Sequence, residues 1–352
     1  MIKSCIFIIF IFLTMHLFGD KMGVLPDVLK PSCIEISHDH LYVVEDAVVY
    51  AYSLKNLKLI KKFGAKGEGP GELKVVPFYP NNVTDLGDRL FFEGYDKIIV
   101  LSREFKLLKS FKKKRRIIKL IPVADNFVAI MLGFSKEKTK FSTLSISLLD
   151  AELKIQKELY QQRLPDREKD VDMVLDSIHF AVYKDKIYVE ESIKDFVIEV
   201  FDRKGDRLYE IKKGFEPVKI TETDKKELVN DFKDDDFVRT MVQREGGWVK
   251  FKNSVNFVFP EKFPPIKDII VRDDKIYVST YEKKDNRQKF IIMDLKGNVL
   301  STTFLPLPIK SSYLFRSLGI DNRFYGISNN NYYYIKENSD SEEWELYVTK
   351  IK

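Results

Sequence analysis

The pentapeptide Asp185-Lys186-Ile187-Tyr188-Val189 recurs identically as Asp274-Lys275-Ile276-Tyr277-Val278. Each copy consists of a turn residue, a polar residue and a burst of apolar and aromatic residues. Four looser copies bring the total to six: Asp39-His40-Leu41-Tyr42-Val43, Asp88-Arg89-Leu90-Phe91-Phe92, Asp125-Asn126-Phe127-Val128-Ala129 and Asn331-Tyr332-Tyr333-Tyr334-Ile335. Successive copies are 49, 37, 60, 89 and 57 residues apart, which is mostly the length of a repeat of four short strands.

The sequence around each copy predicts an antiparallel meander of four strands. A β-rich run, such as residues 269–271, precedes the turn, and Asp or Asn tolerates the left-handed backbone that a tight hairpin needs. A third run follows, as in residues 196–201, and then a second turn, for which residues 202–206 and 294–298 are near duplicates. Six such sheets predict an all-β fold, a six-bladed β-propeller.

The sixth repeat lacks a fourth strand. After its third run, residues 345–348, the sequence given stops at Lys352. An open sheet edge invites aggregation. We therefore expect residues 24–29 to supply the missing outer strand and close the ring, with Pro26 tolerated because that strand is an edge.

Composition excludes several other classes of protein. The 352 residues are 44% hydrophobic and 13% aromatic, enough for a large core and too much for a disordered chain. Two cysteines exclude a disulfide scaffold and a zinc site built mainly from Cys. A net charge of +6 is well short of the basic footprint of nucleic-acid binders, so we expect no nucleic-acid partner.

Residues 1–19 have the features of a secretory signal peptide. Lys3 is followed by an apolar stretch, residues 5–18, that is shorter than the roughly 20 residues of a membrane-spanning helix. We predict removal near Gly19, with an uncleaved anchor as the alternative. The mature domain, residues 20–352, is then periplasmic or extracellular and carries a single thiol, Cys33.

One unit carries a recognisable motif. Residues 63–73 read Phe-Gly-Ala-Lys-Gly-Glu-Gly-Pro-Gly-Glu-Leu, followed by Pro80, Val83, Asp85 and the runs 90–92 and 98–101. This unit resembles the NHL-repeat type of six-bladed propeller, in particular an exported bacterial group that shares the glycine motif; residues 263–268 resemble the same group. The resemblance implies a propeller that usually has a binding role, with enzymes as a minority. The other units lack the full motif.

The glycine-rich segment does not fit a phosphate-binding loop. No Gly-Lys-Ser/Thr ending is present, and Glu72 stands where a dinucleotide fingerprint has its third glycine. Pro70 lacks a backbone donor, and Glu68 and Glu72 would repel an anion. We expect an inter-blade turn.

Glutamate occupies three of the six positions that lie six residues after a turn residue. The six positions hold Glu45, Gly94, Met131, Glu191, Thr280 and Glu337, with Asp46, Glu93 and Glu190 adjacent. The resemblance implies that such carboxylates bond nearby backbone amides. A ring of them could also bind a divalent cation such as calcium. Otherwise we expect no cofactor.

Histidines and catalytic motifs give little support to an enzyme. His38 and His40 flank a turn, His179 stands alone, and neither a Gly-x-Ser-x-Gly elbow nor a His-Glu-x-x-His helix occurs. Some propeller enzymes hold a metal with scattered residues, so a metal-dependent hydrolase or lyase is the alternative to a binding protein.

Residues 112–116, Lys-Lys-Lys-Arg-Arg, form the most basic run. They lie between the second and third predicted blades. We expect a solvated connection, and the alternative is a peripheral contact with an acidic polymer or anionic lipid surface.

A helical insertion is predicted between blades four and five, at residues 216–250. Thr221 is followed by acidic residues as at a helix start, and Leu228, Val229 and Phe232 form an apolar stripe at helical spacing. A second amphipathic piece, residues 237–242, ends at Gly246-Gly247. We expect this cap to dock on the propeller with Trp248 beneath it; partner binding is the alternative.

In a propeller, the loops between second and third strands and the connections between blades lie on one face, here called the loop face. The candidate binding residues predicted to converge there are Glu45, Glu93, Tyr95, Glu190, Glu191, Tyr281, Lys113, Arg115 and Arg116. They predict a non-enzymatic protein that binds a protein, peptide or carbohydrate. Convergent carboxylate, Asn and His groups in the central channel would instead favour the enzyme.

Overall fold

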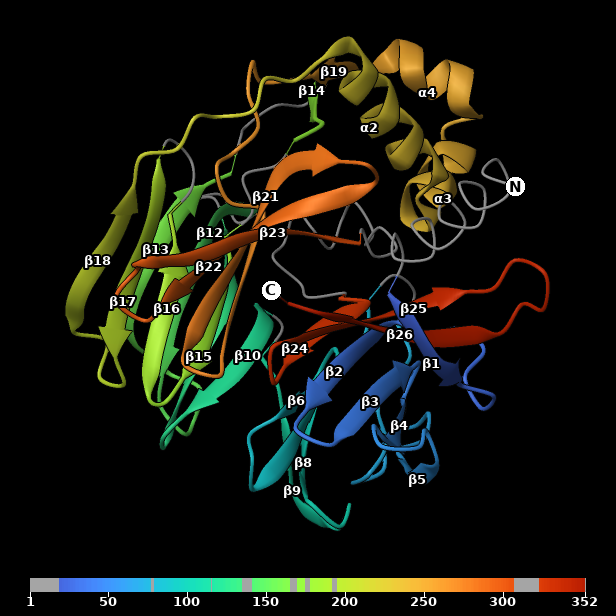
Figure 1. Cartoon of the computed structure of the whole chain (residues 1–352), viewed down its shortest axis with the longest axis vertical. Coiled ribbons are helices and arrows are strands. Elements are labelled where there is room, and N and C mark those ends of the chain that lie inside the picture. The colour runs from blue at the N-terminus through green and yellow to red at the C-terminus, as the bar shows by residue number, and fades with distance from the viewer. Residues whose placement is uncertain are drawn as a thin grey trace, which may run out of the picture.

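The computed structural model describes residues 19–76, 79–114, 116–134, 141–164, 170–174, 178–191, 195–306 and 323–351. Within them the chain forms six four-stranded antiparallel sheets, and Figure 1 shows the red sixth sheet beside the blue first one. The fold is the predicted six-bladed propeller with a helical insertion between blades four and five. From inner to outer strand, the blades are β2 (Cys33–Ser37), β3 (His40–Glu45), β4 (Val48–Ser53), β5 (Leu59–Phe63); β6 (Asn82–Asp85), β7 (Arg89–Glu93), β8 (Lys97–Ser102), β9 (Leu107–Lys112); β10 (Ile117–Val123), β11 (Asn126–Phe134), β12 (Phe141–Leu149), β13 (Ile155–Arg163); β15 (Phe180–Tyr183), β16 (Lys186–Glu190), β17 (Phe196–Asp202), β18 (Arg207–Lys213); β20 (Asp268–Arg272), β21 (Lys275–Lys284), β22 (Arg287–Asp294), β23 (Val299–Pro306); and β24 (Tyr325–Ser328), β25 (Asn331–Glu337), β26 (Trp344–Lys350), β1 (Asp20–Val24).

The turns that join the two inner strands have the predicted left-handed backbone. Lys184 and Asp185 have φ of 48° and 59°, and Asp273 and Asp274 have φ of 52° and 57°. Two consecutive positive φ values make a tight hairpin whose twist matches that of the strands, and Asp is among the residues that adopt them most readily. The pentapeptide therefore marks the start of each second strand, because the turn before that strand depends only on its own residues.

The outer turns of the blades carry a left-handed residue that packs on the preceding blade. In the second blade this residue is Phe105, with φ of 62°, which lies in the core between the first two blades. In the fifth blade it is Gly297, where a Cβ atom would come within 2.4 Å of Ile211 of the fourth blade. Side-chain size at this turn is thus fitted to the neighbouring blade.

The first strand closes the ring at its outer edge. β1 pairs with β26, and Lys21 Nζ lies 2.6 Å from Glu345 Oε1. Hydrogen bonds from Asn338, Lys21 and Tyr347 lower the pKa of Glu345 to about 2. Closure of the ring by the N-terminal segment is confirmed, but the predicted bounds of the strand, residues 24–29, are wrong, since β1 spans Asp20–Val24. Leu25 is fully buried in the core beneath the sixth and first blades, so the chain turns inward there and Pro26 lies outside the strand.

The core lies between the faces of neighbouring blades. The first and second blades share one cluster that includes Val49 and Leu101, and the third and fourth share another that includes Ile146 and Ile187. Large aromatic side chains such as Tyr277 and Tyr332 are buried in the same way between the fifth and sixth blades. This packing holds the loops of the loop face in fixed positions.

The insertion is a cap of three helices: α2 (Glu222–Asp234), α3 (Asp236–Arg244) and α4 (Trp248–Ser254). Thr221 caps α2 as predicted, through a capping box with Asp224. The third helix was not predicted, since Gly246-Gly247 indicated an end; Gly247 instead occupies the N-cap position of α4.

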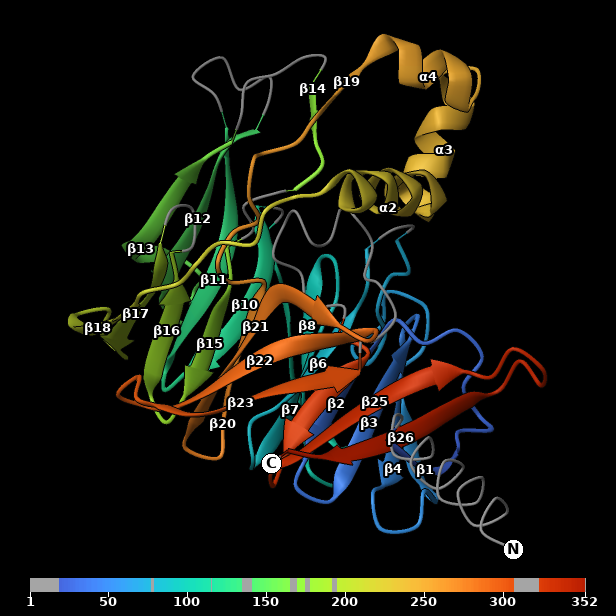
Figure 2. The same ribbon diagram turned by 45° about the horizontal axis from the view of Figure 1, so that its top comes forward.

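The cap has a hydrophobic core of its own. Phe232, Val242 and Phe251 pack with Met173, which comes from the connection before the fourth blade, and Trp248 packs on Phe232. A parallel ribbon of β14 (Asp170–Asp172) and β19 (Asn256–Val258) joins the two connections. Among the described residues this cluster contains none from the six blades, so the apolar stripe packs within the cap and not on the propeller as expected. Helix α2 meets the fifth blade through a polar contact instead, with Lys283 Nζ 3.3 Å from Glu227 Oε2. Figure 2 shows α3 and α4 projecting away from the six blades.

The predicted signal peptide lies outside the described residues except for Gly19. Within the described part of the chain, no helix has both the length and the apolar character needed to cross a bilayer.

Candidate functional site

Glu45 serves the scaffold of the loop face. Its Oε1 accepts hydrogen bonds from the backbone amides of Leu29, at 3.1 Å, and of Lys30, and its Oε2 accepts one from the Tyr50 hydroxyl at 3.1 Å. The carboxylate therefore fixes the connection that leads from the closing strand into the first blade. This geometry supports the backbone-bonding interpretation of the acidic positions.

Glu93 and Lys113 form a buried brace between the second and third blades. Lys113 Nζ donates to Glu93 Oε1 at 2.8 Å and to the Tyr79 hydroxyl at 2.7 Å, while Glu93 Oε2 accepts the Leu120 amide at 3.2 Å. Burial would lower the pKa of Lys113, but Glu93 and Tyr79 raise it above its usual value. The structure thus brings together two predicted site residues. Their contact serves to pack the second blade against the third.

The basic run is divided between solvent and core: Lys112, Lys114 and Arg116 are exposed, whereas Lys113 is buried. Besides the buried Lys113, Lys114 donates to the Leu153 carbonyl, and the Arg116 guanidinium lies 4.8 Å from the centre of the Phe134 ring. Nearby Lys119 is buried, with its ammonium 4.8 Å from the Phe180 ring centre. Arg115 lies outside the described residues. The prediction of a fully solvated connection is therefore wrong at Lys113, which is buried and paired with Glu93.

Two predicted aromatic residues belong to second strands or to the loops after them: Tyr281 lies within β21 and Tyr95 lies two residues beyond β7. Tyr95 is 39% exposed and meets the Tyr79 ring edge-on, at 5.2 Å between centroids. Tyr281 stacks on Phe263 at 4.6 Å, with the rings 10° from parallel. Phe263 is the point where the chain returns from the cap to the fifth blade, so this stack anchors the base of the cap.

The acidic positions do not gather into a ring. Glu190 is buried, Glu191 and Glu337 are exposed, and the corresponding residues of three other blades are not carboxylates. Among the residues that the structure describes, no three His, Cys, Asp or Glu side chains stand close enough to hold a metal ion.

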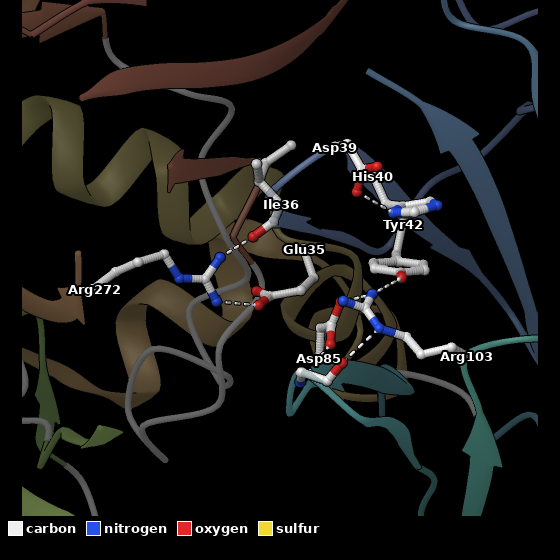
Figure 3. Close-up of polar contacts among 9 residues, drawn as sticks. Glu35, Ile36, Asp39, His40, Tyr42, Asp85, Arg103 and Arg272 are labelled. Atoms are coloured by element: carbon white, nitrogen blue, oxygen red, sulfur yellow. Dashed lines mark hydrogen bonds and ion pairs between the residues drawn. The ribbon is translucent and has the colours of Figure 1, made fainter. Parts of the chain in front are cut away.

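The innermost strands carry a set of ion pairs that the sequence does not predict. Arg272 of the fifth blade donates to Glu35 of the first at 2.7 Å and to the Ile36 carbonyl, so the pair bridges blades that are not neighbours (Figure 3). Burial raises the pKa of Glu35, and the charge of Arg272 opposes that rise. The pair ties the two strands together at the axis.

A second pair lies at the start of the same inner strand. Asp268 accepts two hydrogen bonds from the Arg323 guanidinium, at 2.7 and 2.6 Å, and one from the Tyr325 hydroxyl at 2.7 Å. His179 Nδ1 stands 3.7 Å from the same carboxylate. Burial would raise the pKa of Asp268, but the charge and hydrogen bonds of Arg323 hold it below its usual range.

A third pair lies near the turn of the second blade. Arg103 binds Asp85 at 2.8 Å and the Tyr42 hydroxyl at 3.2 Å, while His40 lies 2.7 Å from Asp39 (Figure 3). Burial raises the pKa of Tyr42 well above its ordinary value. The hydroxyl therefore stays protonated and is available only as a hydrogen-bonding group.

These pairs decide what the axial residues can do chemically. The carboxylates of Glu35, Asp85 and Asp268 each pair with an arginine, which binds one oxygen of Glu35 and of Asp85 and both oxygens of Asp268. A general base or metal ligand needs a free lone pair. Charged groups thus do converge near the axis, which is the feature that would favour an enzyme. Their carboxylates are paired with arginines, however. The sequence carries a signal for these groups: Glu35 interrupts the otherwise apolar strand β2, and Asp268 and Arg272 are the first and last residues of β20.

Comparison with known proteins adds little to this geometry. No model of a protein family matches the chain, and no curated protein matches it. Solved structures with a similar fold include a protein of Bacteroides fragilis named as an exported protein, with 11% identity over 92% of both chains and a TM-score of 0.48. The WD40 domain of Pan2 from Neurospora crassa is 9% identical over 92% of this chain and 90% of its own, with a TM-score of 0.40. BamB of Moraxella catarrhalis is 10% identical over 90% and 71%, with a TM-score of 0.31. All three scores lie below 0.5, so the assignment as a six-bladed propeller rests on the order of strands in this chain itself.

Proposed function

We propose that this chain is an exported, non-enzymatic propeller that binds a protein partner on its loop face. The cap carries the proposal. It holds its own core, built from two inter-blade connections, and none of the blades needs that core for its packing. Elements added to a rigid scaffold without a packing role are where binding is usually placed.

The surface of the cap supports a macromolecular partner. Val249 of α4 is 73% exposed, and Trp248 beside it is only partly buried. Large apolar and aromatic side chains at a surface are typical anchors of protein interfaces. A peptide or a carbohydrate on Tyr95 and Tyr281 is the other ligand class that these aromatic residues would fit, and the test below separates the two.

The proposal includes export of the chain and its membership of the NHL-repeat type of propeller. The apolar residues 5–18 support a secretory signal, and the glycine motif of residues 63–73 supports the NHL-repeat type of propeller. Removal of the signal after Gly19 would leave Asp20, the first residue of β1, at the new N-terminus. Mass analysis of the protein recovered from the cell envelope should find that end; a chain beginning inside or beyond β1 would contradict it.

The stalk of the cap allows a clean deletion. The Ile220 amide donates to the Glu261 carbonyl at 3.0 Å, and Lys219 pairs with Lys262 in an antiparallel bridge. Residues 221–260 can therefore be replaced by an Asn-Gly turn, which suits two adjacent antiparallel strands. Met173→Ser removes the apolar side chain that the deletion would expose.

Site-specific photo-cross-linking tests the proposal. A photoreactive residue is placed at Val249 on the cap, at Tyr95 on the loop face, and at Leu208 on an outer strand as the control; Leu208 is 48% exposed. We expect a discrete cross-linked protein from Val249, absent from Leu208 and from the chain without the cap. Cross-linking from Tyr95 alone would favour a ligand bound away from the cap. Equal cross-linking from all three positions would refute a specific face.

A further inference from the structure

The glycine-rich loop encloses an ammonium group. Lys97, at the start of β8, reaches into the loop, and its Nζ donates to the main-chain carbonyls of Glu68 at 2.8 Å, Gly69 at 2.7 Å and Glu72 at 3.0 Å. A lysine ammonium has three protons, so these three carbonyl oxygens satisfy it completely.

The loop holds this shape through bonds of its own. The amides of Gly67 and Leu73 donate to the carbonyls of Leu73 and Ala65, each at 3.0 Å, and the Gly69 amide donates to Glu72 Oε2 at 2.8 Å. A Cβ atom on Gly67 would lie 2.0 Å from Glu72 Oε2, so the folded-in carboxylate requires glycine there. The amides are used within the loop, and carbonyls are left facing its centre.

This polarity is opposite to that of a phosphate-binding loop. Phosphate loops present backbone N–H groups to an anion, whereas this loop presents C=O groups and carries Glu68 and Glu72. We propose that residues 65–73 form a cation site for a primary ammonium group, that Lys97 is its resident occupant, and that a free alkylammonium ion can replace the shortened side chain.

The site has a consequence for the loop face. Lys97 directly follows the loop that carries Tyr95 and Asp96, and the glycine-rich loop is the connection between the first two blades. The ammonium therefore ties two segments of the loop face together and sets the position of Tyr95. This inference concerns the scaffold of the loop face and does not depend on the identity of any partner.

Lys97→Ala tests the site by chemical rescue, since it removes the equivalent of a propylammonium ion. Hydrogen exchange of the Gly67 and Leu73 amides reports whether the loop opens. We expect exchange to accelerate by about tenfold or more, because hydrogen bonds to a charged group are lost. Propylammonium chloride should restore slow exchange, and tetramethylammonium chloride at equal ionic strength should not, because it has no N–H donor.

Lys74→Ala is the matched control. Lys74 belongs to the same region but binds carboxylates, Glu68 at 3.1 Å and Asp96 at 3.0 Å. We expect its removal to leave exchange of the two loop amides unchanged. Unchanged exchange in Lys97→Ala would overturn the proposal. So would equal acceleration in both variants, or a rescue in which propylammonium does no better than tetramethylammonium.

Discussion

The buried brace between the second and third blades gives the sharpest test of the fold. Glu93 is 5% exposed, and its carboxylate faces the Lys113 ammonium at 2.8 Å. Among the described residues, Lys113→Met would leave that buried carboxylate a single hydrogen-bond donor, the Leu120 amide. Removing one partner of a buried pair typically costs about 3–5 kcal/mol in the free energy of unfolding.

Thermal and denaturant unfolding measure this loss. In a chain of 352 residues, it corresponds to a fall in Tm of roughly 4–7 °C, taking about 2.1 cal/mol/K of unfolding entropy per residue. The matched control is Lys112→Met, because the neighbouring Lys112 is exposed, and exposed substitutions usually stay within about 0.5 kcal/mol. The double variant Lys113→Met/Glu93→Gln should recover most of the loss, since no charge remains buried.

The outcome separates two views of the basic run. If Lys113 were part of a solvated basic surface, Lys113→Met would cost no more than Lys112→Met. A loss below about 1 kcal/mol in the single variant, or a double variant no better than the single one, would refute the brace.

Three further predictions follow from other contacts. Gly297→Ala should cost about 2–4 kcal/mol, from a left-handed backbone and from the 2.4 Å approach of a Cβ atom to Ile211, and the double variant with Ile211→Val should regain part of it. Glu345 has a pKa of about 2 in the folded protein, below its unfolded value of about 4.3, so its contribution to stability is present above about pH 4.3 and is lost as the pH falls towards 2. Glu345→Gln should flatten acid unfolding over that window, and an unaltered pH profile would contradict the assignment. Arg272→Met should cost about 2 kcal/mol at pH 7 and less at pH 5, because the raised pKa of Glu35 lets the folded state take up a proton; a loss independent of pH would contradict the axial pair.

The part of the fold that the sequence predicts is the part that local chemistry controls. The turn at Asp185 needs only its own backbone and the adjacent strands, and Thr221 caps α2 through a residue three positions away. Such signals lie within a few residues of each other. They were sufficient to predict six blades and an insertion between the fourth and fifth.

The parts that were missed depend on contacts between distant residues. The bounds of the closing strand follow from its pairing with β26 and from the burial of Leu25, neither of which residues 20–29 reveal by themselves. The core of the cap needs Met173, which comes from a different connection. Lys113 is read as a surface charge in a basic run because only the fold brings Glu93 to it.

The arginines near the axis, Arg272 and Arg323, contribute to closure of the ring. The outer seal is the pairing of β1 with β26, but the inner strands of the sixth and first blades are also joined, by the Ile34 amide donating to the Arg323 carbonyl at 2.8 Å. Arg323 in turn binds Asp268, and Arg272 of the same strand binds Glu35. The fifth, sixth and first blades are thus linked at the axis by charged groups whose partners lie on different blades. Opening the ring between the sixth and first blades would break the outer pairing of β1 with β26 and would also separate Glu35 from Arg272, so the outer and axial contacts oppose the same motion.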